Sequence, residues 1–175
     1  MTAEDTLTRR GFEPTFDVRQ IRRVVTGVDG EGRSTVEYED HSPHLREVAT
    51  TIAYTEVWTT PSAAPGGGPA DGGDVPETLV PERHGTLFRI CEMKPDPEAN
   101  ESRAAGEPTG MHTTPTVDYI MVLSGRLTLT LGDGSECQLA PGDVVVQRGT
   151  EHAWSVDGPE PAVFAAIIVD AGRGA

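Results

Sequence analysis

The last third of this 175-residue chain is a close succession of short, β-rich runs. From Arg126 to Leu131, leucine alternates strictly with polar residues, which predicts a strand with one buried face. Several strands with no helix between them predict a sandwich or barrel, so we expect an all-β fold. The runs cover residues 117–123, 126–131, 136–139, 143–147, 152–156 and 162–169, and turn-forming residues separate them.

The earlier part of the chain predicts four more strands, at 21–26, 34–38, 51–59 and 87–93. A turn at Gly27–Gly30 joins the first two into a hairpin, and residues 1–20 are expected to form an N-terminal arm. Two stretches, Pro61–Pro81 and Lys94–Gly110, are rich in Gly, Pro and acidic residues, which predicts mobile loops. Residues 21–175 are therefore expected to form one domain, with its barrel motif at 106–170.

Composition limits the partners. The chain has 14 Lys and Arg against 28 Asp and Glu, a net charge of −14, and so much negative charge disfavours nucleic acid. No run is long and apolar enough for a membrane span, and Met1–Arg10 lacks the apolar core of a signal peptide. Cys91 and Cys137 match no metal or redox motif and are expected to be reduced, buried thiols. These features predict a cytoplasmic protein.

The order of residues between Gly106 and Val156 carries a family resemblance. The first segment sets His112, Thr114 and Asp118 between Gly106 and Gly125, and the second runs from Pro141-Gly142-Asp143 to His152. Both resemble the two cupin motifs, which implies a single cupin domain, a jelly-roll antiparallel β-barrel. The family usually has His in place of Thr114 and Glu in place of Asp118. A narrower group of small bacterial cupins resembles this chain at both positions.

The resemblance implies a metal site on His112, Asp118 and His152. Strand geometry agrees, because side chains at even separation point to one face, and His112, Thr114 and Asp118 share that parity. Two imidazoles and one carboxylate with open positions suit non-haem Fe(II), and Mn, Co, Ni or Zn can substitute. Asp118 and Thr114 are then the candidate catalytic residues. A degenerate, metal-free cupin is the alternative.

Two further residues are candidates for the substrate pocket. Trp154 shares parity with His152 and is a candidate wall of the substrate pocket, or else plain core. Arg148 is a candidate anchor for a substrate carboxylate, or else a solvated charge. Three further histidines, His41, His44 and His84, are expected at the surface.

Three functions remain open. The first is a metal-dependent enzyme of oxygenase type acting on a small organic molecule. The second is a Lewis-acid metalloenzyme, such as a decarboxylase, dehydratase, isomerase or polyketide cyclase. The third is a non-catalytic small-molecule binding module, because one fold hosts many activities. We also expect a homodimer through Ile21–Tyr38, since a small barrel has exposed edges.

Overall fold

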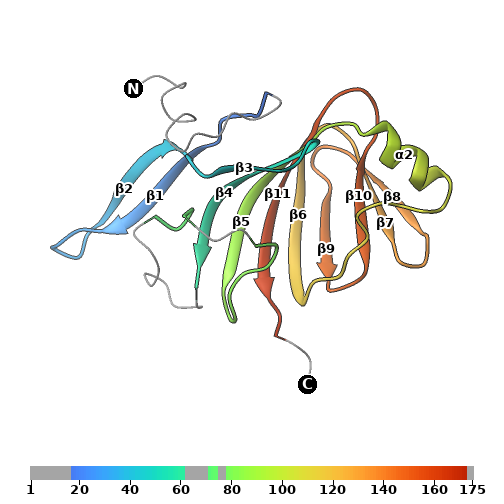
Figure 1. The fold of residues 1–175 in the computed structure, drawn as a ribbon. Helices are drawn as coiled ribbons and strands as arrows, with labels where there is room; N and C mark the ends of the chain where they lie inside the picture. The colour runs from blue at the N-terminus through green and yellow to red at the C-terminus, as the bar shows by residue number, and fades with distance from the viewer. Residues whose placement is uncertain (1–16, 62–70, 75–77, 173–175) are drawn as a thin grey trace.

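The structure is a computed structural model that describes residues 17–61, 71–74 and 78–172 (Figure 1). The described part is built almost entirely of strands and holds one short helix that begins at Pro97. None of its helices is long and apolar enough to cross a membrane. The strands are β1 (Arg22–Val28), β2 (Ser34–His41), β3 (Leu45–Ala49), β4 (Ile52–Thr60), β5 (Thr86–Met93), β6 (Thr116–Ser124), β7 (Leu127–Leu131), β8 (Glu136–Leu139), β9 (Val144–Arg148), β10 (His152–Val156) and β11 (Ala162–Asp170).

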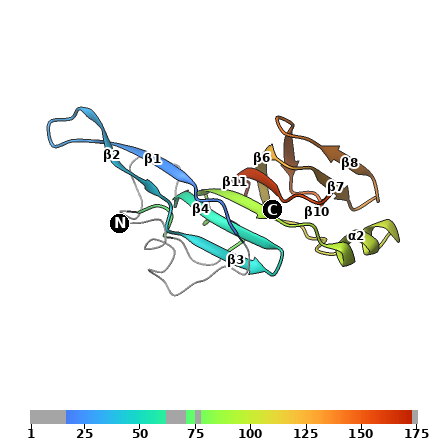
Figure 2. The same ribbon diagram turned by 90° about the horizontal axis from the view of Figure 1, so that it is seen from above.

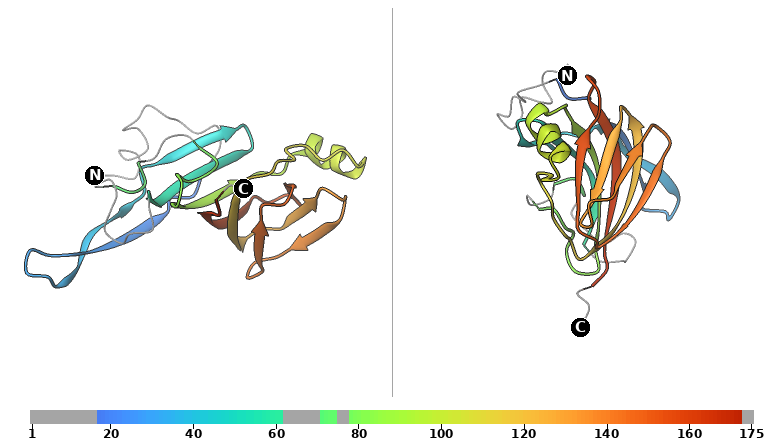
Figure 3. Two further views of the ribbon diagram at one scale, coloured as in Figure 1. Left: turned by 90° about the horizontal axis from the view of Figure 1, so that it is seen from below. Right: turned by 90° about the vertical axis from the view of Figure 1, so that its right-hand side faces the viewer.

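Three antiparallel sheets organise these strands. A six-stranded sheet has the order β3-β4-β5-β11-β6-β9, and a three-stranded sheet has the order β10-β7-β8. The hairpin β1–β2 forms a sheet of its own and extends away from the other two (Figures 1 and 2). The three-stranded sheet lies at the opposite end, close to the helix, as the further views show (Figure 3). The all-β architecture expected from the sequence is confirmed.

The core follows from strand alternation. On β6 the buried residues are Thr116, Asp118, Ile120 and Val122, while Tyr119, Met121 and Leu123 between and after them are exposed. Neighbouring β11 contributes inward side chains to the same layer, because the two strands pair along almost their whole length. The layer between the large and small sheets is the main apolar cluster. It consists of Leu87, Cys91, Ile120, Val122, Leu127, Val156, Ala162, Phe164, Ala166 and Ile168.

Most predicted strands lie within one or two residues of their observed bounds, and the hairpin is where it was expected. Strand β3 was missed. The turn before β7 needs glycine, since Gly125 has a φ of 77° and an added Cβ would lie 2.5 Å from Ala162 Cα. Both cysteines are free thiols, as expected, but Cys137 is exposed and not buried.

The prediction of a loop over Lys94–Gly110 is wrong in part, because helix α2 spans Pro97–Ala104. Asp96 caps it by accepting a hydrogen bond from the Ala99 amide at 3.1 Å, and proline occupies the first turn. Near its end, Arg103 donates to Glu136 and Asp157, each at 3.0 Å. These contacts hold a helix that has no buried side chain to anchor it.

A buried arginine fastens the hairpin to the body of the protein. Arg23 on β1 is 5% exposed and donates to both Asp40 on β2 and Asp71, at 2.7–2.9 Å. His44 contacts the same Asp71 carboxylate at 2.8 Å and is itself buried, so its expected surface position is wrong. Gly73 permits this approach, since an added Cβ would lie 2.5 Å from the His44 ring.

Part of the Pro61–Pro81 stretch is therefore fixed in place, while residues 62–70 and 75–77 lie outside the described residues. Burial disfavours the charged form of Asp71, but hydrogen bonds from Arg23, His44 and the Gly73 amide outweigh it and lower the pKa of this carboxyl. A carboxyl with a lowered pKa stabilises the fold above about pH 4, and that stability is lost as the pH falls toward its folded-state pKa.

We expect Asp71→Asn to lower the free energy of unfolding by about 1–3 kcal/mol at pH 7, because Arg23 loses one of its two charged partners. Urea denaturation measures this, and the difference from the wild type should shrink below about pH 4. Glu39→Gln is the matched control, because the Arg22–Glu39 pair is exposed on both sides. Equal effects of the two changes would show that the Asp71 contacts do not stabilise the fold.

Candidate active site

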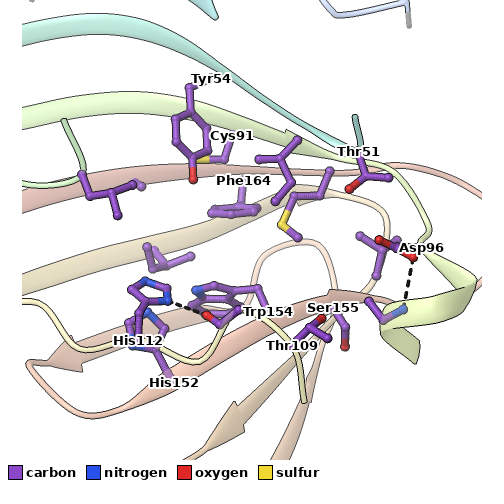
Figure 4. Close-up of a pocket in the computed structure, with 18 of the residues that line it drawn as sticks. Thr51, Tyr54, Cys91, Asp96, Thr109, His112, His152, Trp154, Ser155 and Phe164 are labelled. Carbon is purple, nitrogen blue, oxygen red and sulfur yellow. Dashed lines mark hydrogen bonds between the residues drawn. The ribbon is translucent and has the colours of Figure 1, made fainter. Parts of the chain in front are cut away.

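A pocket of about 210 Å³ opens between the large and small sheets (Figure 4). Its lining combines side chains from the inner face of β4, β5, β6 and β11 with residues of β10 and of α2. The three predicted metal ligands, His112, Asp118 and His152, all line it, together with Thr114 and Trp154. The structure therefore brings the sequence-predicted residues to one place.

The route by which His112 reaches the pocket differs from expectation. His112 and His152 exchange two backbone hydrogen bonds, of 3.0 and 2.9 Å, so His112 lies beside the start of β10. The parity argument holds only along one continuous strand from His112 to Asp118, and β6 begins only at Thr116. Pro115 stands at the break and has no amide hydrogen for a strand ladder.

The two imidazoles lie together, with ring centroids 4.3 Å apart. His112 Nδ1 is 2.8 Å from the Gly110 carbonyl oxygen, and His152 Nδ1 is 2.9 Å from that of Thr150. A carbonyl only accepts, so in a neutral imidazole held this way Nδ1 carries the hydrogen and Nε2 keeps its lone pair. His152 Nδ1 also lies 3.1 Å from Gln147 Nε2, a longer contact than the one to the Thr150 carbonyl oxygen. Within the described part of the chain, neither Nε2 has a recorded hydrogen bond. This is the tautomer that a metal ligand requires.

His152 is also held in the neutral form. It is 3% exposed, and burial lowers its pKa. Gln147 on β9, itself 3% exposed, donates to the Thr150 carbonyl at 2.8 Å and fixes the segment that orients the imidazole. An imidazole that is neutral at pH 7 has a lone pair available for a cation or a proton.

Asp118 brings a carboxylate to the pocket from the large sheet. It is 8% exposed, and its Oδ1 is buried without a hydrogen-bond partner among the described residues. Burial raises its pKa, against the opposing effects of the Thr116 hydroxyl and of the two imidazoles. An unsatisfied buried carboxylate oxygen is costly, so this atom is suited to receive a cation or a proton.

Two imidazole lone pairs and an unpartnered carboxylate oxygen in one pocket fit a divalent transition metal in the chemistry of the donors. In the structure, however, His112, His152 and Asp118 are not arranged around one common metal position. Across residues 17–61, 71–74 and 78–172, no group of three or more His, Cys, Asp and Glu side chains is arranged to hold a metal ion. The histidine pair is the assembled part, and Asp118 reaches the pocket from the opposite sheet.

Thr114 lies at the pocket wall, where its hydroxyl is 2.7 Å from that of Thr116. Trp154 points into the cavity, as one of its two sequence interpretations had it. Its ring stacks on Phe164 with centroids 5.7 Å apart and planes 29° apart, and it meets the His152 ring edge-on. These two aromatic side chains give the pocket a flat apolar wall beside the histidines.

Arg148 does not line this pocket. It is an exposed residue at the end of β9, and it borders a separate depression on the surface. Gln147 points inward, so strand alternation turns Arg148 outward, and the expected anchor for a substrate carboxylate is not at this position.

Sequence reasoning missed an ion pair in the pocket wall. Arg89 on β5 is 2% exposed and lines the pocket, and its Nε and Nη2 lie 3.2 and 3.0 Å from the Glu56 carboxylate. Tyr54 lies beside it, with the guanidinium carbon 4.6 Å from the ring centroid. The sequence did hold a signal for Arg89. It lies an even number of residues from Leu87, Cys91 and Met93 on a buried strand, so its side chain points to the same face as theirs.

Residues 101–169 match the family model of the cupin domain. The cupin-domain-containing oxidoreductase fogC of Aspergillus ruber is 26% identical over 145 residues, 81% of this chain and 66% of the relative. The oxidoreductase srdD of Neurospora crassa is 27% identical over 81% of this chain and 69% of the relative. The chain thus spans about two thirds of the length of these curated relatives.

Solved structures are more distant. A conserved protein with a double-stranded β-helix domain from Klebsiella pneumoniae is 17% identical, covers 75% of this chain and 82% of its own, and has a TM-score of 0.48. KdgF from Halomonas is 14% identical, covers 74% and 86%, and has a TM-score of 0.46. Residues 101–169 thus match the cupin family, and the curated relatives and the all-β architecture support the resemblance read from the sequence.

Proposed function

We propose that this chain is a metal-dependent oxidoreductase that oxidises a small organic molecule in the pocket between its two main sheets. One observation carries the proposal: two neighbouring imidazoles line the same pocket as a buried carboxylate oxygen of Asp118 that has no hydrogen-bond partner among the described residues. Relatives described as cupin-domain-containing oxidoreductases support the redox class of reaction.

In this proposal His112, His152 and Asp118 hold the metal, and Fe(II) is favoured because two histidines and one carboxylate leave open positions. Such a metal supplies the positions at which a small molecule and dioxygen meet. The chain's own residues do the rest. Trp154 and Phe164 position a flat molecule and exclude water from the reacting end of the pocket.

Oxygen uptake tests the proposal. Protein stripped of metal and reloaded with Fe(II) should consume dioxygen in proportion to the loss of substrate when offered small phenols, aldehydes and carboxylic acids. Protein loaded with Zn(II) should be inactive, because Zn(II) has no redox chemistry. Equal turnover by the Zn(II) form without oxygen uptake would contradict the proposal and favour Lewis-acid chemistry.

The homodimer through Ile21–Tyr38 stays a prediction. The hairpin that contains this segment pairs with neither of the larger sheets, which is consistent with a role in association. Val24, Val28 and Val36 are exposed on it.

A further inference from the structure

At the end of the pocket that Arg89 and Tyr54 line, the wall contains a buried ion pair. Arg89 and Glu56 are both almost fully buried, which is uncommon for charged residues in the wall of a cavity. The Arg89 side chain is oriented by Glu56, by the Thr78 carbonyl 2.8 Å from Nη2, and by the face of the Tyr54 ring. The guanidinium is thus fixed before any ligand arrives, which lowers the entropy cost of binding.

Two hydrogen-bond donors at this end lack acceptors. The recorded bonds of Arg89 use Nε and Nη2, so Nη1 has no acceptor among the residues that the structure describes. The Tyr54 hydroxyl likewise has none within that part of the chain, and Figure 4 shows it directed into the cavity. Burial raises the pKa of Tyr54 to about 12, so the phenol stays a donor at neutral pH.

The charge of Arg89 favours an acidic oxygen here. Its counter-ion Glu56 lies 3.0 Å from Arg89 and also 3.6 Å from Arg46, so the carboxylate does not serve Arg89 alone. Arg89 is the guanidinium in the lining of this pocket. A buried positive charge with a free donor is a strong site for an acidic oxygen.

The shape of the cavity selects a flat partner. Trp154 and Phe164 stack across the middle of the pocket, between the Tyr54 end and the histidine pair (Figure 4). The volume of about 210 Å³ lies below the ~300–1,000 Å³ of pockets for drug-sized ligands, which indicates a small molecule.

We propose that Arg89 and Tyr54 anchor the acidic oxygen group of a small, planar, conjugated substrate, and so set the end of the molecule that faces His112 and His152. The inference rests on the proposed function for the pocket, since it names the substrate class of that same site. Its binding step needs neither metal nor dioxygen, so the anchor and the redox chemistry can fail separately.

Calorimetric binding of trans-cinnamate tests the anchor, with the protein measured as purified and after treatment with a chelator. Cinnamamide tests the charge, and 3-cyclohexylpropanoate tests planarity. We expect the wild type to bind cinnamate at least about 10-fold more tightly than either analogue, because a hydrogen bond to a charged group is worth that much. Chelation should leave the cinnamate affinity unchanged.

Variants then assign the anchor. Tyr54→Phe removes only the unpartnered hydroxyl, and Arg89→Lys keeps the positive charge beside Glu56, so both should fold. Each is expected to weaken cinnamate binding by about 10-fold and to narrow the gap between cinnamate and cinnamamide. Tyr119→Phe, the same change at an exposed tyrosine outside the pocket, should bind as the wild type does.

Several results would overturn the anchor while leaving the redox proposal standing. They are equal binding of cinnamate and cinnamamide, no binding of any of the three compounds at millimolar concentration, and cinnamate binding that disappears on chelation. Another is weakening only in Lys94→Gln, which would place the anion at the opposite end of the pocket.

Discussion

His152→Ala is expected to lower turnover at least about 100-fold while the protein stays folded. Loss of a partner that only orients a metal ligand costs 10–100-fold in activity, so loss of the ligand itself should cost more. The fold should survive because the main core is apolar and independent of the imidazole. His112→Ala should behave in the same way, since its imidazole lies 4.3 Å from that of His152.

The matched control is His41→Ala, which removes an exposed imidazole from the distant hairpin strand β2. It should keep both turnover and fold, and circular dichroism should report similar strand content in all three variants. Wild-type turnover by His152→Ala would remove this residue from the catalytic site.

Glu56→Leu is expected to lower the free energy of unfolding by about 3–5 kcal/mol, because it leaves the buried Arg89 without its main counter-charge. A guanidinium stays charged at any pH at which the protein folds, so the variant cannot escape by losing a proton. For a chain of this size, the melting temperature should fall by about 6–20 °C. Glu39→Leu, at the exposed Arg22–Glu39 pair, is the matched control and should change stability little.

Replacement of Arg89 instead of Glu56 is expected to lower the stability by an amount that depends on pH. Burial raises the pKa of Glu56, and Arg89 and Arg46 oppose that rise. In Arg89→Leu the carboxyl can take up a proton, and the stability that a raised pKa confers is present at low pH and lost as the pH rises. The destabilisation of Arg89→Leu should therefore be smaller at pH 5 than at pH 8. Destabilisation that is independent of pH would mean that Glu56 takes up no proton in the folded variant and stays ionised there.

Sequence periodicity predicted the strands because alternation of apolar and polar residues is a local property of the sequence, as Arg126–Leu131 shows. The expectation of a single buried face is wrong for this strand, because Thr128 and Thr130 are buried as well as the leucines between them. Strand β3 and helix α2 were missed for a related reason. Each is short, and contacts between distant segments hold it, such as the Arg103 pairs with Glu136 and Asp157. The local signal for α2 was Asp96-Pro97, an N-cap followed by proline.

In the candidate site, too, the sequence predicted what depends on local motif spacing and missed what depends on contacts between distant strands. Motif spacing brought His112, Asp118 and His152 to one pocket, although the break at Pro115 places His112 beside β10 and not on β6. Arg89 and Tyr54 were beyond reach, because their part in the pocket depends on how β4 and β5 pair with each other and with β11. His44 was misplaced because its partner Asp71 lies 27 residues away.

Elemental analysis of the protein purified without added metal tests the metal centre most directly. The account predicts about one equivalent of a divalent transition metal per chain in the wild type, with iron the favoured element. It predicts that His112→Ala and His152→Ala lose it and that Asp118→Asn, which keeps the shape but not the charge, binds it more weakly. The same metal content in all four proteins, or a wild type that takes up no metal even when Fe(II) is supplied, would contradict it.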